Sequence, residues 1–172
     1  MWSFPGKQLV FMGCEFGQWQ EWREQHSLDW HLLEQPEHRA LLDLNRDLNH
    51  LYRENPALHA GDTDPAGFAW IDLHNGDQSV FAFLRRSPLH PDRPPLLCVF
   101  NCTPVPREAY WLGVPEAGTY RKVLDSDAAR FGGSAFNQQE RVVSQLAPCQ
   151  GYPSHVRLDL PPLGALFFEL AD

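Results

Sequence analysis

The chain has 172 residues, of which 43% are hydrophobic and 21% are charged, so it can fill the core of one domain, or of a small domain with part of another. Its formal net charge of −8 argues against a nucleic-acid partner, because phosphate backbones are bound by clustered lysine and arginine. No apolar run approaches the roughly 20 residues of a membrane span, so no membrane segment is expected.

The first 60 residues show the pattern of one strand, one long loop and one helix. The run 8–12, "QLVFM", is continuously apolar and bounded by glycines, which predicts a strand buried on both faces of a parallel sheet. Residues 14–35 are irregular and rich in aromatic side chains. A helix is predicted to open at Pro36 and to stop near Asn55, before Pro56. Its apolar stripe comprises Leu41, Leu44, Leu48 and Leu51.

The pattern of the sequence changes after Gly61, where many short strands are predicted. Asn75-Gly76 is a hairpin signal between the first two of them. Residues 125–155 carry little periodicity and are predicted to form a long loop. Short strands at this spacing indicate an antiparallel β-sandwich over residues 61–172. The predicted strands are 67–73, 79–86, 95–103, 109–114, 119–124, 156–160 and 165–170.

A strand, a loop and a helix over residues 1–60 form the repeating unit of a β/α barrel, yet a barrel needs eight such units and typically about 250 residues. We therefore expect residues 1–60 to be the last unit of a truncated (β/α)8 barrel. The sandwich would be the domain that follows it. On this interpretation the chain is the carboxyl-terminal piece of a larger enzyme.

Specific stretches of the sequence carry a resemblance. The segment "FPGKQLVFMGCEFGQWQEWREQHSLDWHLL" is similar to the region around the eighth barrel strand of bacterial glycogen branching enzymes of the α-amylase superfamily. The similarity continues through "DPAGFAWID" and "TPVPR" to "LPPLGALFFEL" and covers nearly the whole chain. Cys14 and Cys102 depart from the family, which has asparagine and phenylalanine at these positions.

The resemblance implies a mainly β fold with a sandwich of the α-amylase carboxyl-terminal type. It also implies a cytoplasmic enzyme of glycogen biosynthesis, without a cofactor or metal, that acts on α-glucan such as glycogen or amylose. The family cleaves an α-1,4 bond and transfers the glucan segment to a 6-hydroxyl, which makes an α-1,6 branch. Such retaining chemistry needs a nucleophilic and an acidic carboxyl group. In the superfamily these groups follow earlier barrel strands, so no catalytic residue is assigned to this chain.

The loop after the first predicted strand contains the candidate substrate-binding residues of the intact enzyme. Sites of β/α barrels form at the carboxyl ends of the strands, which is where this loop begins. Indole rings suit the apolar faces of glucose, and carboxylate or amide groups can bind its hydroxyls. The candidates are Glu15, Gln18, Trp19, Glu21 and Trp22.

Each candidate also has a structural interpretation. Glu15 could hydrogen-bond loop amides or an upstream arginine, and its spacing from Glu21 does not favour an acid pair. Trp2 and Trp30 are predicted to pack, and Trp70, which alternates with Phe68, is predicted to lie in the sandwich core. The histidines lack the spacing of metal ligands, and His26 and His31 are interpreted as polar loop residues.

The four cysteines are interpreted as reduced thiols, as is usual in the cytoplasm. Cys98 and Cys102 lie four residues apart on a predicted strand, which separates them by about 13 Å. A disulfide requires α-carbons within about 7 Å.

Three classes of function stay open at this point. The first is the carboxyl-terminal part of a glucan branching enzyme. The second is the corresponding part of another α-amylase superfamily enzyme, and the third is a free-standing carbohydrate-binding sandwich. The barrel-like unit at residues 1–60 argues against the third class, since an independent sandwich does not require it.

Overall fold

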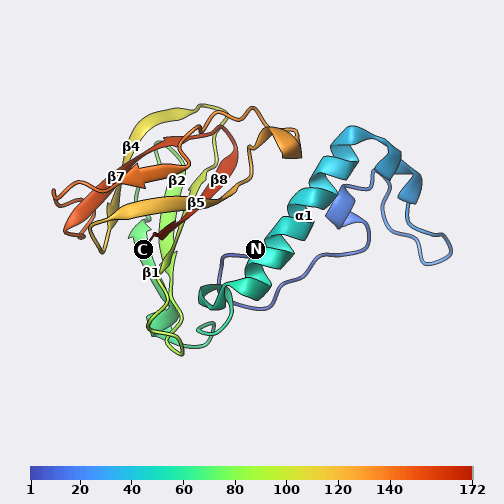
Figure 1. Ribbon diagram of the computed structural model, residues 1–172. Coiled ribbons are helices and arrows are strands. Elements are labelled where there is room, and N and C mark those ends of the chain that lie inside the picture. Colours follow the sequence, from blue (N-terminus) through green and yellow to red (C-terminus); the bar gives the residue numbers. More distant parts are fainter. Residues whose placement is uncertain (172) are drawn as a thin grey trace.

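The computed structural model describes residues 1–171. A mainly β body is joined to an amino-terminal part that carries the long helix α1 (Pro36–Glu54), as Figure 1 shows. Before α1 lie the short 3-10 helices η1 (Cys14–Phe16) and η2 (Trp30–Glu34). Two further turns, η3 (Pro56–Leu58) and η4 (Pro65–Gly67), lead into the strands. The predicted helix is confirmed, with proline at its start and Pro56 directly after its end.

The strands form two antiparallel sheets, which confirms the predicted β fold. A six-stranded sheet has the order β1-β2-β3-β8-β5-β6, and β4 pairs with β7 in a second sheet. All seven strands predicted for the sandwich are present. The strands are β1 (Phe68–Asp72), β2 (Val80–Arg85), β3 (Leu96–Asn101), β4 (Arg107–Val114), β5 (Thr119–Asp125), β6 (Arg141–Val143), β7 (Ser154–Leu160) and β8 (Gly164–Leu170).

Strand β6 corrects the prediction of a continuous loop over residues 125–155. It has only three residues and pairs with Thr119, Tyr120 and Arg121 of β5. Three residues are too few to produce a recognisable alternation, so only the neighbouring strand reveals it.

The six-stranded sheet is buried on both faces. On β2, Ala82 and Leu84 face the core between the two sheets, whereas Phe83 faces a second core on the opposite side. Leu44, Leu48 and Leu51 of α1 pack into this second core. Leu41, the first residue of the predicted stripe, lies beside Gly17 of the loop instead. The apolar stripe of α1 therefore joins the amino-terminal part to the sandwich.

The prediction that Trp70 lies in the sandwich core is wrong. Ile71 points into the core between the sheets, so its neighbour Trp70 points to the opposite face, where it stays 39% exposed. There its ring packs against Phe68 at a centroid distance of 5.0 Å and against Phe4 at 6.3 Å. Because both faces of β1 carry apolar side chains, alternation alone could not tell which face is interior.

The predicted buried strand at residues 8–12 is also wrong for this structure. Residues 8–11 adopt no regular structure, Met12 lies in a turn with φ 28°, and the segment pairs with no strand of residues 1–171. Leu9 is 68% exposed and Phe11 is 53% exposed. An apolar strand is buried only when neighbouring strands and helices cover it, and no such neighbour lies within the described residues.

The hairpin between β1 and β2 is confirmed, but its turn is not the two-residue Asn-Gly type. The chain turns at Gly76–Ser79, where the Ser79 amide donates to the Gly76 carbonyl at 3.2 Å, and Ser79 has φ 49°. The Asn75 side chain instead donates to the Tyr110 hydroxyl at 2.7 Å. The asparagine therefore links the hairpin to β4, a contact that the local sequence did not predict.

Arg85 fastens the start of the chain to the sandwich. Its side chain is fully buried and donates to the Asp62 carboxylate at 2.6 Å and to the Ser3 carbonyl at 2.7 Å. A longer contact of 3.4 Å reaches the Gly67 carbonyl. One guanidinium thus fastens the start of the chain and the segment 62–67 to β2.

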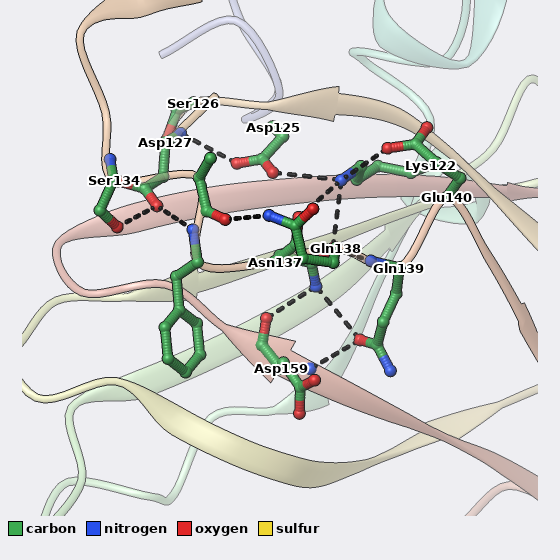
Figure 2. A network of polar contacts seen from close by, with 12 residues as sticks. Lys122, Asp125, Ser126, Asp127, Ser134, Asn137, Gln138, Gln139, Glu140 and Asp159 are labelled. Atoms are coloured by element: carbon green, nitrogen blue, oxygen red, sulfur yellow. Dashed lines mark hydrogen bonds and ion pairs between the residues drawn. The ribbon is translucent and has the colours of Figure 1, made fainter. Parts of the chain in front are cut away.

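A polar network orders the segment after β5, as Figure 2 shows. The Lys122 ammonium donates to the Asp125 carboxylate at 3.2 Å and to the carbonyl and side-chain oxygens of Asn137, each at 3.1 Å. The Asn137 amide group donates in turn to the Asp159 carbonyl of β7 at 2.7 Å. The network therefore joins the loop to both sheets.

Asp127 accepts three hydrogen bonds within this loop. The donors are the Ser134 amide at 2.8 Å, the Ser134 hydroxyl at 2.7 Å and the Phe136 amide at 3.0 Å. Burial raises the pKa of the Asp127 carboxyl, but the hydrogen bonds from Phe136 and Ser134 outweigh burial and leave this pKa below its ordinary value of 3.8.

The lowered pKa predicts a pH-dependent contribution to stability. The contribution of the carboxylate is complete above the pKa in the unfolded chain and is lost as pH falls through the lower folded pKa. Asp127→Asn should therefore reduce the free energy of unfolding at neutral pH, and this deficit should shrink in acid. Urea unfolding from neutral pH to about pH 3 measures the deficit. A deficit that is the same at every pH would show that ionisation of Asp127 does not contribute.

Candidate functional site

The candidate residues lie on the loop that precedes α1. Two buried polar side chains of α1 hold this loop. His38 Nδ1 lies 2.7 Å from the Phe16 carbonyl oxygen, and the Asn45 amide group donates to the Glu15 carbonyl at 3.0 Å. Phe16 is fully buried beside them. The loop thus has its own small core, which fixes the backbone around Glu15.

Glu15 adopts a structural role in the described residues. Its carboxylate accepts the Gly13 amide at 3.0 Å, so it closes the turn at the start of η1. Gly13 has φ 93°, a left-handed conformation that favours glycine. Hydrogen bonding to loop amides was one of the roles that the sequence suggested for Glu15.

Gln18 bridges two parts of the loop. Its side-chain oxygen accepts the Asp29 amide at 2.9 Å, and its nitrogen donates to the Gln20 carbonyl at 2.9 Å. Both the oxygen and the nitrogen of the side-chain amide are therefore hydrogen-bonded. Gln18 thus holds the part of the loop around Asp29 near η1.

The remaining candidates are exposed. Trp19 is 71% exposed, with one ring edge against His38 at a centroid distance of 5.1 Å. Trp22 is 39% exposed and packs edge-on against Phe11 at 5.6 Å. Glu21, between them in sequence, is exposed as well. These three side chains are free to contact a ligand, unlike Glu15 and Gln18.

A hollow of about 380 Å³ is lined by residues of this loop. Of the candidates, only Gln18 and Glu21 line it, whereas Trp19, Trp22 and Glu15 do not. Its other lining residues are Gln20, Arg23, His26, Ser27, Leu28 and Asp29. Asp29 was not among the site residues predicted from the sequence, although this residue belongs to the distinctive stretch "SLDWHLL". The wall of the hollow is polar, as suits a hydroxylated ligand.

Trp2 and Trp30, the other tryptophans of the amino-terminal part, were predicted to pack, and each makes a contact within that part. The Trp2 ring N–H donates to the Asn49 side chain on α1 at 2.8 Å. Trp30 lies against Phe16 at a centroid distance of 5.1 Å, although half of its surface stays exposed.

Titratable side chains do not gather into a metal site within residues 1–171. His26 and His31 are both exposed. All four cysteines are free, with Cys98 buried and Cys14 and Cys102 exposed. Over the same residues, no helix combines the length and apolar character needed to cross a membrane.

Comparison with known proteins relates the chain to one family. A family described as "Alpha amylase, C-terminal all-beta domain" matches residues 70–171. The 1,4-alpha-glucan branching enzyme GlgB of Thiobacillus denitrificans is 48% identical over 167 residues, which are 97% of this chain and 22% of that enzyme. The enzyme of the same name from Pseudomonas aeruginosa is 49% identical over 171 residues, or 99% of this chain and 23% of that enzyme.

The chain thus spans less than a quarter of the length of these curated relatives. Among solved structures, an α-amylase from H. orenii matches with a TM-score of 0.57 and 17% identity, over 98% of this chain and 33% of the other. At that identity the likeness concerns the fold. It includes both the amino-terminal part and the sandwich, because nearly the whole chain is covered.

Proposed function

The chain belongs to the family of the α-amylase C-terminal all-β domain, and we propose that it is the carboxyl-terminal part of a 1,4-α-glucan branching enzyme. The observation that supports this proposal is identity of 48–49% to enzymes of that name along nearly the whole chain. The identity extends beyond the sandwich into the strand, loop and helix before it. A free-standing sandwich module does not account for that extension.

The proposed reaction of the parent enzyme is cleavage of an α-1,4-glucan and transfer of the segment to a 6-hydroxyl. Its two catalytic carboxyl groups are proposed to lie outside this chain. The organisation of the loop supports this, because Glu15 is engaged with the Gly13 amide and Glu21 is exposed. A retaining pair has to face the scissile bond at about 5 Å from each other.

We propose that the candidate residues divide into two roles. Glu15 and Gln18 shape the loop through their hydrogen bonds to backbone groups. Trp19, Glu21 and Trp22 are exposed and are proposed to contact α-glucan in the parent enzyme. Indole rings can stack on glucose while the carboxylate accepts a hydrogen bond from a glucose hydroxyl.

The proposed domain division places residues 1–60 in the catalytic barrel and residues 61–172 in the sandwich. The exposed apolar segment Leu9–Met12 supports the first assignment, because it has the composition of a buried barrel strand. A cytoplasmic location is proposed as well. Two exposed free thiols, Cys14 and Cys102, are compatible with a reducing compartment.

A chimeric enzyme tests the proposed function. The matching segment of the P. aeruginosa branching enzyme is replaced by this chain, and branching of amylose is followed by the iodine spectrum and by α-1,6 content. We expect the chimera to branch amylose, and the enzyme truncated before this segment and the isolated chain to be inactive. A chimera that folds but forms no α-1,6 bonds would contradict the proposal.

The same chimera tests the role of the tryptophans. Trp22→Ala should lower the branching rate about twofold to tenfold, as expected when about 0.5–1.5 kcal/mol of aromatic contact is lost. Trp111→Ala is the matched control, since Trp111 is similarly exposed at 48% but lies on β4 of the sandwich. Equal effects of the two substitutions would argue against a glucan contact at Trp22.

A further inference from the structure

A cleft of about 790 Å³ lies between the end of α1 and strands β5, β6 and β8 of the sandwich. The last turns of α1 and Pro56 form one wall. The loop before β3 contributes Arg93 and Pro94, and strands β5, β6 and β8 form the remaining wall. This cleft lies apart from the loop that carries the candidate glucan residues, and none of those residues lines it.

The charge of the cleft is opposite to that of the chain. Its lining contains four cations, Arg93, Arg121, Lys122 and Arg141, and two carboxylates, Glu54 and Glu169. The chain as a whole has 14 lysines and arginines against 22 aspartates and glutamates. Cations are therefore concentrated in the cleft.

The register of the strands places two of these cations directly opposite each other. Arg121 of β5 is the cross-strand partner of Arg141 on β6. Like charges in such positions destabilise a sheet. On its other side Arg121 faces Glu169 of β8, with which it forms an ion pair. Across β6, β5 and β8, the Glu169 carboxylate thus lies in one row with two guanidinium groups, those of Arg121 and Arg141.

Two guanidinium groups of the cleft, those of Arg93 and Arg141, have unused hydrogen-bond donors. Lys122 is engaged by Asp125, Asn137 and Glu140, so its charge is already compensated. Neither Arg93 nor Arg141 donates a side-chain hydrogen bond or forms an ion pair within residues 1–171. The negative end of the α1 dipole can attract one nearby cation, but it does not explain why two arginines face each other on β5 and β6.

We propose that this cleft binds a phosphate-bearing ligand through Arg93, Arg121 and Arg141. A guanidinium group presents two parallel N–H donors that match phosphate oxygens, and an anion between Arg121 and Arg141 relieves their repulsion. The adjoining hollow of about 480 Å³ shares Arg93 and Pro94 with the cleft and adds Arg86 and the buried hydroxyl of Ser87. That hydroxyl has no hydrogen-bond partner within the described residues. That hydroxyl is not accessible to solvent, so the hollow offers room for the remainder of the ligand rather than a polar contact.

Titration of the isotope-labelled 172-residue chain tests the proposal by NMR. The probes are inorganic phosphate, glucose 6-phosphate and neutral glucose. We expect the two phosphate probes to cause saturable shifts of amide signals on β5, on β6 and at Arg93, and glucose to leave those signals unchanged. Tighter binding of glucose 6-phosphate than of inorganic phosphate would assign the site to sugar phosphates. Equal binding would assign it to the phosphate group alone.

Variants connect the shifts to the cleft. Arg93→Ala combined with Arg141→Ala should weaken phosphate binding at least about tenfold, because charge-assisted contacts are lost. Arg39→Ala is the control, since Arg39 is exposed on α1 outside the cleft. Absence of saturation up to about 20 mM phosphate, or equal affinity in the double variant and the wild type, would overturn the proposal. Arg141→Gln alone provides a milder variant if the double substitution impairs folding.

Discussion

Arg85→Met is expected to lower the free energy of unfolding by about 3–5 kcal/mol, which is typical when one partner of a buried ion pair is removed. Arg85 is fully buried, and its partner Asp62 is only 17% exposed. Methionine fills much of the same space but leaves the Asp62 carboxylate without its cation. The Ser3 carbonyl also loses its side-chain donor, whereas the Gly67 carbonyl keeps the Arg86 amide as a donor. Loss of hydrogen bonds, rather than loss of volume, therefore causes the effect.

Urea unfolding measures this change, with Arg86→Met as the matched control. Arg86 is the next residue, is only half-buried and makes no side-chain ion pair within the described residues, so its replacement should change stability by less than about 1 kcal/mol. Hydrogen exchange should in addition show faster exchange at the start of the chain, because the contact with Ser3 is lost. Equal effects of the two substitutions would show that Arg85 does not fasten the segments.

Lys122→Met is expected to destabilise the protein by about 3 kcal/mol. The Lys122 and Asp125 side chains are 9% and 7% exposed, so removal of the ammonium leaves a buried carboxylate without a counter-charge. The Asn137 carbonyl would also lose this donor, whereas the Asn137 side-chain oxygen would keep the Gln139 amide as its donor. The loop would then be anchored to the sheets mainly through Asn137 and Asp159 (Figure 2).

The double variant Lys122→Met with Asp125→Asn separates charge from packing. If the uncompensated carboxylate causes most of the loss, the double variant should be more stable than Lys122→Met alone. Glu140→Gln serves as the control, because Glu140 also pairs with Lys122 but is 79% exposed, where an ion pair contributes less than about 1 kcal/mol. A double variant that is less stable than Lys122→Met would contradict this explanation.

Features that repeat along the sequence could be predicted well. The helix from Pro36 to Glu54 follows from its leucine spacing and from the prolines at both ends. Seven strands were found from short apolar runs between proline and glycine turns, because those runs reflect local backbone preference. The family resemblance rested on distinctive stretches such as "SLDWHLL", and the comparisons support it. For the candidate site, the sequence placed all five residues on one loop but did not show which of them are engaged.

Which face of an element is buried was decided by the tertiary structure. Trp70 and Ile71 are both apolar and adjacent, yet only Ile71 enters the core between the sheets. The apolar run at residues 8–12 can form a strand only beside neighbouring strands, and it pairs with none within the described residues. Glu15 and Gln18 were candidates for ligand contact, but the structure uses them to hold loop backbone groups.

By itself, therefore, the sequence identified the family, the helix, seven strands in their order and one loop that carries all five candidate residues, because short stretches of neighbouring residues carry these signals. Only the tertiary structure decided the contacts between distant residues: the hold of Arg85 on Ser3, the bonds of Asn137 to Lys122 and Asp159, and the opposition of Arg121 and Arg141. Hydrogen bonds and ion pairs form wherever the folded chain brings a donor to an acceptor. Spacing along the sequence does not record that distance.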